Sequence, residues 1–128
     1  MMRAAVTSLA LAAALLTAVP AQSHHSNVAY EVTKVITITG VVKEFRWVNP
    51  HTWLHLMVDE ANGGKVEWQV EGRAPGVLLR AGWTKASLKP GEKVTVDMSP
   101  AKDGTKVGII ARITKEDGTI LSNQPVLQ

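Results

Sequence analysis

The sequence predicts an all-β domain, a small closed barrel with one short helix, and three observations lead to this prediction. Several segments show the alternation of apolar and polar residues that is typical of half-buried strands. Asn, Gly and Pro, which favour tight turns, separate these segments. A compact apolar segment with helix-type ends lies between the third and the fourth strand segment.

The first strand is expected over Val35–Trp47, which is rich in β-branched and aromatic residues. Its apolar alternation changes phase at Gly40. Two sets of residues result, Ile36 with Ile38 on one parity and Val41, Phe45 and Trp47 on the other. A bulge or a sharp coil at the glycine would return both sets to one side, so that one long strand serves two sheets of a barrel.

The second and third strands form a predicted hairpin. His51–Val58 carries an apolar triplet that should face the core, Leu54, Leu56 and Val58. Asn62-Gly63-Gly64 is a turn sequence. In the third strand, Val66, Trp68 and Val70 alternate with Lys65, Glu67, Gln69 and Glu71. We expect the glutamates to be solvated.

The rest of the chain completes the barrel. Pro75–Ala81 is expected to be a short helix that ends at Gly82. Residues 94–98 and 107–113 are the fourth and fifth strands, and Asp117-Gly118 turns a short tail back. Three strands, a helix and two strands is the order of the five-stranded oligonucleotide/oligosaccharide-binding (OB) barrel. A β-sandwich fragment is the alternative, but it needs no helix at this position.

The N-terminus resembles a secretory signal peptide, since one basic residue precedes an apolar run that Pro20 ends. The apolar run is shorter than the roughly 20 residues that a membrane-spanning helix needs. We therefore expect no membrane span in the processed protein. Cleavage after Ala21 or after Ser23 fits the small-residue rule. The expected parts are a removed signal (1–23), an N-terminal arm (24–34), the barrel (35–121) and a tail (122–128), in a periplasmic or secreted protein.

Composition narrows the functional classes. The chain has no cysteine, which excludes disulfides, thiolate metal sites and cysteine nucleophiles. Its net charge of +3 is small and interspersed, which argues against binding of nucleic acid or a membrane surface. Gly-x-Ser-x-Gly, His-Glu-x-x-His and phosphate-binding glycine loops are absent. A binding protein is therefore favoured over an enzyme.

Three of the four histidines, His24, His25 and His51, are the candidate metal ligands. His24 and His25 stand at the boundary of the predicted signal peptide. Cleavage at either predicted position creates a terminal amine near these imidazoles, and such nitrogen ligands suit copper(II) or nickel(II). His51, in the corner Asn49-Pro50-His51, would complete the site at a barrel rim. A solvated His pair, and a turn histidine bonded to a carbonyl, are the alternatives.

Three other residues have weaker assignments. His55 lies four strand residues from His51, about 13 Å, so we expect it to be partly covered and at most to support the site. Glu71 is a candidate for a further ligand or for orienting an imidazole. Trp53 is the aromatic residue expected to be exposed. An envelope module that binds a protein, glycan or small ligand over the Trp53 face, without metal, is the alternative function.

A family resemblance covers essentially the whole mature chain. Its motifs are His24-His25-Ser26, Thr39-Gly40-Val41-Val42, Trp47-Val48-Asn49-Pro50-His51, Val66-Glu67-Trp68, Ala74-Pro75, Ala81-Gly82-Trp83-Thr84, Ser87-Leu88-Lys89-Pro90-Gly91 and Asp117-Gly118. In this order they resemble the domain of unknown function 6152 family of bacterial exported proteins. The resemblance implies a secreted or periplasmic domain of small β architecture, and it implies no established activity.

Overall fold

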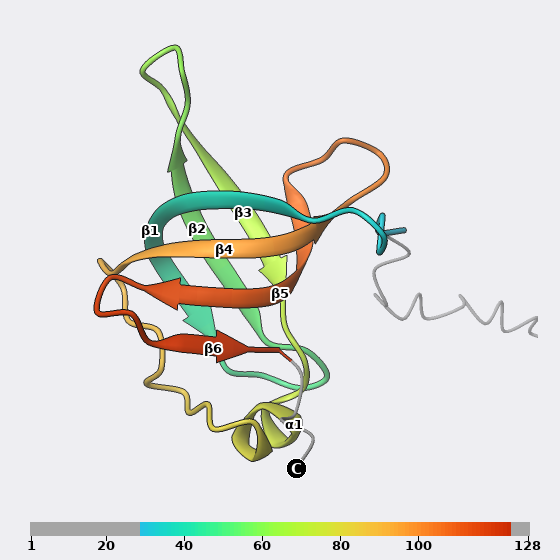
Figure 1. Cartoon of the computed structure of the whole chain (residues 1–128), viewed down its shortest axis with the longest axis vertical. Coiled ribbons are helices and arrows are strands. Elements are labelled where there is room, and N and C mark those ends of the chain that lie inside the picture. Colours follow the sequence, from blue (N-terminus) through green and yellow to red (C-terminus); the bar gives the residue numbers. More distant parts are fainter. Residues whose placement is uncertain (1–28, 124–128) are drawn as a thin grey trace, which may run out of the picture.

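The computed structural model describes residues 29–123 (Figure 1). The predicted signal peptide, the His24–His25 pair and residues 124–128 of the tail lie outside the described residues. The elements are β1 (Ile36–Arg46), β2 (Trp53–Asp59), β3 (Lys65–Glu71), α1 (Pro75–Arg80), β4 (Lys93–Pro100), β5 (Val107–Lys115) and β6 (Ile120–Ser122).

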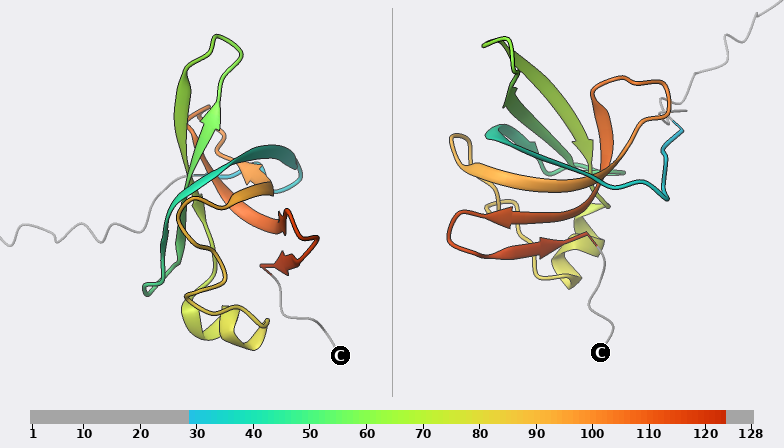
Figure 2. Two further views of the ribbon diagram at one scale, coloured as in Figure 1. Left: turned by 90° about the vertical axis from the view of Figure 1, so that its left-hand side faces the viewer. Right: turned by 45° about the horizontal axis from the view of Figure 1, so that its top comes forward.

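The first five strands close into a barrel, which confirms the predicted all-β class and the helix between the third and fourth strands. Hydrogen bonding joins them in the order β3-β2-β1-β4-β5, and the parallel pairing of β3 with β5 closes the ring. The helix α1 lies at one end of the barrel, and the β2–β3 hairpin projects beyond the other end (Figures 1 and 2).

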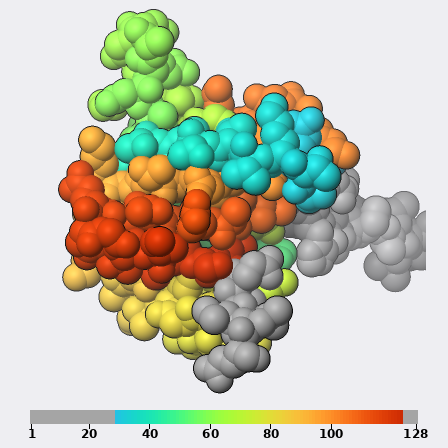
Figure 3. Space-filling view, in the orientation of Figure 1, coloured from blue at the N-terminus to red at the C-terminus, as the bar shows by residue number. Residues whose placement is uncertain are grey.

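The tail after Asp117-Gly118 turns back, as expected, and forms the short strand β6 antiparallel to β5. The N-terminal arm is also joined to the barrel. Tyr30 forms a β-bridge with Ala101, and the N–H of Glu31 donates to the carbonyl of Pro100 at 2.9 Å. In Figure 3 this arm lies against the loop that follows β4.

The phase change in β1 is present, but its predicted position was wrong. The pairing of β1 with β2 shifts register between Val42 and Glu44, so the bulge lies around Lys43. Val42 therefore faces the core with 1% of its surface exposed, whereas Val41 is 41% exposed. Gly40 has another role, because a Cβ there would lie 2.5 Å from the carbonyl oxygen of Met57.

The corner before β2 is fixed by Thr52, and the strand begins at Trp53, two residues later than predicted. The backbone N–H and the hydroxyl of Thr52 both donate to the carbonyl of Arg73, at 3.3 and 2.9 Å. The N–H of Gly72 donates to the carbonyl of Thr52 at 2.9 Å. His51 therefore lies in a loop that is bonded to the end of β3, where the Asn49–Pro50 peptide is cis.

The core holds most of the aromatic residues, as predicted. Trp83 is fully buried just after α1, and its indole N–H donates to the carbonyl of Ser122 at 2.7 Å. The other buried members are mainly β-strand residues of alternating position, including Val42, Leu54, Leu56, Trp68, Val70, Val94, Val96, Met98, Ile110 and Ile113. Because Leu78 of α1 is also fully buried, the helix closes its end of the barrel.

Candidate functional site

Three side chains from distant parts of the chain meet at the α1 end of the barrel. Nδ1 of His51 lies 2.9 Å from Oε1 of Glu71. The hydroxyl of Tyr30 donates to Oε2 of the same carboxylate at 2.8 Å. Glu71 is the last residue of β3, between Trp53 of β2 and Ile109 of β5 in the two ladders. The backbone of Glu71 is therefore held on both sides by strands, while its carboxylate contacts Tyr30 and His51.

The burial of these side chains differs in a way that bears on chemistry. The Glu71 side chain is only 11% exposed, whereas that of His51 is 46% exposed. The expectation that Glu71 is solvated was therefore wrong: its position in both ladders draws the carboxylate into the barrel wall. An ionised carboxylate can only accept, so its proximity favours a proton on Nδ1 of His51. That tautomer leaves the lone pair of Nε2 available as an acceptor or a ligand.

A second histidine–glutamate pair joins β2 and β3. Nδ1 of His55 and Oε1 of Glu67 form a hydrogen bond of 3.0 Å, and Nζ of Lys43 lies 3.3 Å from the same oxygen. The hydrogen bond to His55, and then that to Lys43, lowers the pKa of Glu67 below its ordinary value. His55 is 16% exposed, partly covered as expected. It does not share a partner with His51.

Two hollows flank His51, and both also include Arg73. The first, of about 370 Å³, is lined by Pro50, His51, Arg73, Ala74, Val77 and Arg80, and is called the arginine hollow below. The second, of about 420 Å³, lies where β3 meets β5, with Glu71, Ile109, Val32 and Asn123 among its residues. His51 thus lies on the ridge between two concave surfaces.

The predicted site residues are partly brought together. Glu71 contacts His51, while His55 is in a separate pair and Trp53 is half-buried in β2. Within residues 29–123, no group of three or more His, Asp or Glu side chains could hold a metal ion. The other two predicted ligands, His24 and His25, lie outside that range.

Sequence reasoning missed Tyr30, Arg73 and Arg80. Tyr30 is the single tyrosine of the chain and lies in the arm before β1. An aromatic residue with a hydroxyl at this position could have indicated that the arm is anchored to the barrel. The two arginines gave no such signal, because each stands alone in the sequence. Only the packing of α1 beside the Asn49–His51 corner places them in one hollow.

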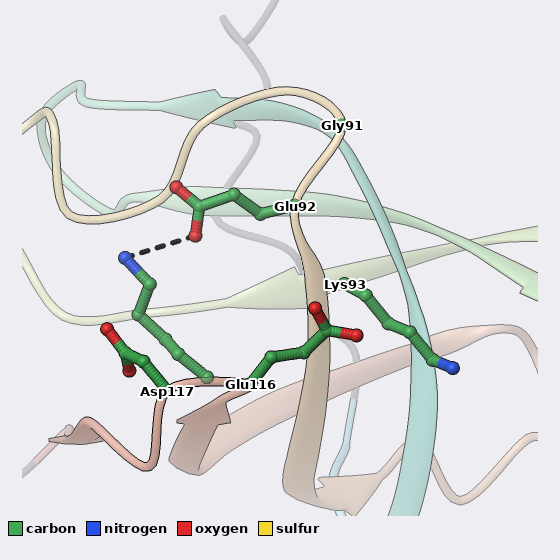
Figure 4. Close-up of a pocket in the computed structure, with 6 residues that line it drawn as sticks. Gly91, Glu92, Lys93, Glu116 and Asp117 are labelled. Carbon is green, nitrogen blue, oxygen red and sulfur yellow. Dashed lines mark ion pairs between the residues drawn. The ribbon is translucent and has the colours of Figure 1, made fainter.

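A further hollow of about 400 Å³ lies between the start of β4 and the end of β5 (Figure 4). Its side chains have mixed charge, and Nζ of Lys115 pairs with Oε2 of Glu92 at 3.0 Å. Asp117 accepts hydrogen bonds from Thr119, which lower its pKa. Since its acidic side chains are interspersed with lysines and no histidine is present, this hollow is a weaker candidate than the surface around His51.

Among the described residues, no helix has the length and apolar character needed to cross a bilayer.

Comparison with known proteins identifies a family but no activity. Residues 12–111 match the model of a family described as a family of unknown function, DUF6152. No curated protein matches the chain. Among solved structures, the chain is similar to a mitochondrial single-stranded DNA-binding protein from S. cerevisiae, with 15% identity and a TM-score of 0.48. That match covers 70% of this chain and 96% of the other chain.

Proposed function

Because this chain belongs to the DUF6152 family of unknown function, its role has to be argued from its own residues, and we propose that it is an exported, non-enzymatic metal-binding protein. The metal is copper(II), held by His51 together with His24, His25 and the new terminal amine. The role of the protein is to traffic or to buffer this ion in the periplasm.

The observation that carries this proposal is the contact between His51 and Glu71. Imidazoles that bind metals are commonly oriented by a carboxylate at the other ring nitrogen, which also raises their basicity. His51 has this arrangement, with Nδ1 at 2.9 Å from a nearly buried carboxylate and a ring that is 46% exposed. Nε2 of His51 has no protein partner within residues 29–123, so it remains available to a ligand.

The length of the arm supports participation of the two N-terminal histidines. Tyr30 is bonded to Glu71, the residue that also contacts His51. His25 and His24 lie five and six positions before Tyr30, and an extended chain of that length spans up to about 20 Å. An arm that is anchored at Tyr30 is therefore long enough for the proposed contact of these imidazoles with His51.

The donor chemistry suits the proposed ion. Imidazole and amine nitrogens favour copper(II) over calcium or magnesium, which prefer oxygen. The terminal amine has an ordinary pKa of about 7.7 to 8.0, so a metal displaces its proton more easily than that of a lysine. A cleavage at either predicted site supplies this amine close to His24.

The test is a copper(II) titration by calorimetry on protein purified from the periplasm, after intact mass has identified its first residue. His24→Ala and His51→Ala should each abolish tight binding, because each removes one nitrogen ligand. The matched control is His55→Ala, which removes an imidazole that is held by Glu67 and should leave tight binding intact. Unchanged affinity in both of the first two variants, or a first residue beyond Ser26, would refute the proposal.

A further inference from the structure

The two arginines of the arginine hollow have no charged partner in the part of the chain that the structure describes. Within residues 29–123, neither Arg73 nor Arg80 forms an ion pair, although Arg46 and Arg112 do. The backbone of Arg73 is nevertheless fixed. Its N–H donates to Oδ1 of Asn123 at 3.0 Å, and its carbonyl accepts two hydrogen bonds from Thr52. Arg73 thus has a well-anchored backbone and a side chain without an ion pair among the described residues, and it lines the hollow.

Among residues 29–123, no carboxylate lines the arginine hollow. The carboxylate that contacts His51 is that of Glu71, and both of its oxygens have partners, His51 and Tyr30. Two fixed positive charges without a local counterion create a positive potential, and a concave surface concentrates it. Guanidinium groups are also the side chains best matched to the planar, two-oxygen edge of a carboxylate or a phosphate.

The remaining wall of the hollow is largely apolar. Pro50, Ala74 and Val77 line it, contributed by the corner before β2 and by the first turns around α1. Its volume of about 370 Å³ lies in the range of sites for small molecules, about 300 to 1,000 Å³. Cationic groups beside an apolar wall favour a ligand that combines an anionic head with an apolar body.

From this combination we infer that the arginine hollow is a binding site for a small organic anion. The carboxylate or phosphate of the ligand contacts the guanidinium groups of Arg73 and Arg80, and its apolar part packs against Pro50 and Val77. This site goes beyond the proposed copper function, because neither arginine is a metal ligand. His51 lies at the rim of the hollow, so the anion and a metal on Nε2 would be neighbours.

The test uses the full processed protein, freed of metal with EDTA and labelled with nitrogen-15 for NMR titration. The probes are benzoate, phenyl phosphate, inorganic phosphate and the uncharged benzyl alcohol. Benzoate or phenyl phosphate should shift the backbone amides of Arg73, Val77 and Arg80 in a saturable way, and comparison of the two identifies the preferred head group. Inorganic phosphate should bind more weakly, and benzyl alcohol should cause no saturable shift.

Variants separate the hollow from a general charge effect. Arg73→Gln and Arg80→Gln should each lower the affinity for the tighter-binding probe about tenfold, because each removes one charge-assisted hydrogen bond. Lys102→Gln removes the same charge from an exposed side chain of the β4–β5 loop and should leave binding unchanged. If Arg73→Gln did not fold, Arg80→Gln on the exposed end of α1 would still decide the question.

The inference fails if no probe gives saturable shifts at the hollow, or if Lys102→Gln weakens binding as much as the arginine variants do. Failure of the copper proposal is distinguishable, because the NMR titration contains no metal. His51→Ala should abolish tight copper binding and still bind the organic anion through the two arginines.

Discussion

At the scale of single residues, identical side-chain types have different properties because of what surrounds them. His51 and His55 each have a glutamate at Nδ1, but His55 is 16% exposed and hydrogen-bonded in the strand surface, whereas His51 is 46% exposed in a loop. The exposure of their glutamates shows the opposite order, because Glu71, the partner of the more exposed His51, is more buried than Glu67. The combination of a buried carboxylate and an exposed imidazole distinguishes the pair at the barrel end.

Glu71→Gln tests the orienting role of the carboxylate. Copper(II) affinity should fall about 10- to 100-fold, because a neutral amide attracts the Nδ1 proton of His51 less strongly and leaves Nε2 a weaker donor. The measurement is a competition titration against a chelator of known affinity. Glu67→Gln, the equivalent change beside His55, should have no effect on copper binding. Equal affinities of the two variants would show that Glu71 does not position the ligand.

At the scale of the elements, β4 is held to both neighbouring strands through one carboxylate. Asp97 accepts a hydrogen bond of 2.6 Å from Thr37 of β1 and bonds of 3.0 and 2.7 Å from Arg112 of β5. The hydrogen bond from Thr37, and then that from Arg112, lowers the pKa of Asp97 below its ordinary value of 3.8. These contacts therefore stabilise the strand pairing while Asp97 is ionised.

The pH dependence of Asp97→Asn follows from the sign of this shift. A carboxyl whose pKa is lower in the folded state stabilises the fold above its unfolded pKa of about 3.9, and the contribution is lost as pH falls through the folded pKa. Thermal unfolding from neutral pH down to about pH 2 should show the variant less stable than the parent near neutrality, and the difference should shrink in acid. The control is Glu60→Gln, because Glu60 lies in the β2–β3 hairpin and forms no ion pair within residues 29–123. A constant difference at all pH values would contradict the prediction.

At the scale of the whole molecule, the C-terminal segment completes the end of the barrel that carries the candidate site. Ser122 accepts the indole N–H of Trp83, and Asn123 accepts the N–H of Arg73. Asn123 also donates from its own N–H to the carbonyl of Ala111 at 3.1 Å. Residues far apart in the sequence thus hold the core tryptophan and the arginine hollow in place.

Truncation after Thr119 should reveal this contribution. Loss of β6 leaves the buried indole N–H of Trp83 unpaired, at a cost of about 1–3 kcal/mol, and removes the packing of Leu121, worth about 1–2 kcal/mol. We expect the free energy of unfolding to fall by about 3 kcal/mol in urea denaturation. A chain truncated after Asn123 keeps these contacts and is the control. Equal stability of the two truncated chains would show that β6 is dispensable.

Local chemistry was sufficient to predict the order of strands, turns and helix. Side-chain alternation marks a strand facing a core, and residue pairs such as Gly63-Gly64 mark a turn, so neighbouring residues carry this information. The barrel followed from that order, whereas the family resemblance came from short motifs along the chain and agrees with the family match over residues 12–111. The bulge was misplaced by a few residues because Val41 and Val42 are equally apolar, and only the pairing with β2 decides which of them faces inward.

The composition of the site, in contrast, was decided by tertiary structure. Tyr30 and Glu71 are 41 positions apart, and their hydrogen bond exists because the arm pairs with the residue after β4 while β3 closes onto β5. Arg73 and Arg80 share a hollow with His51 because Thr52 bonds the corner to the end of β3. A linear pattern shows which groups a chain carries. Their proximity depends on how the barrel closes, since closure alone brings distant segments together.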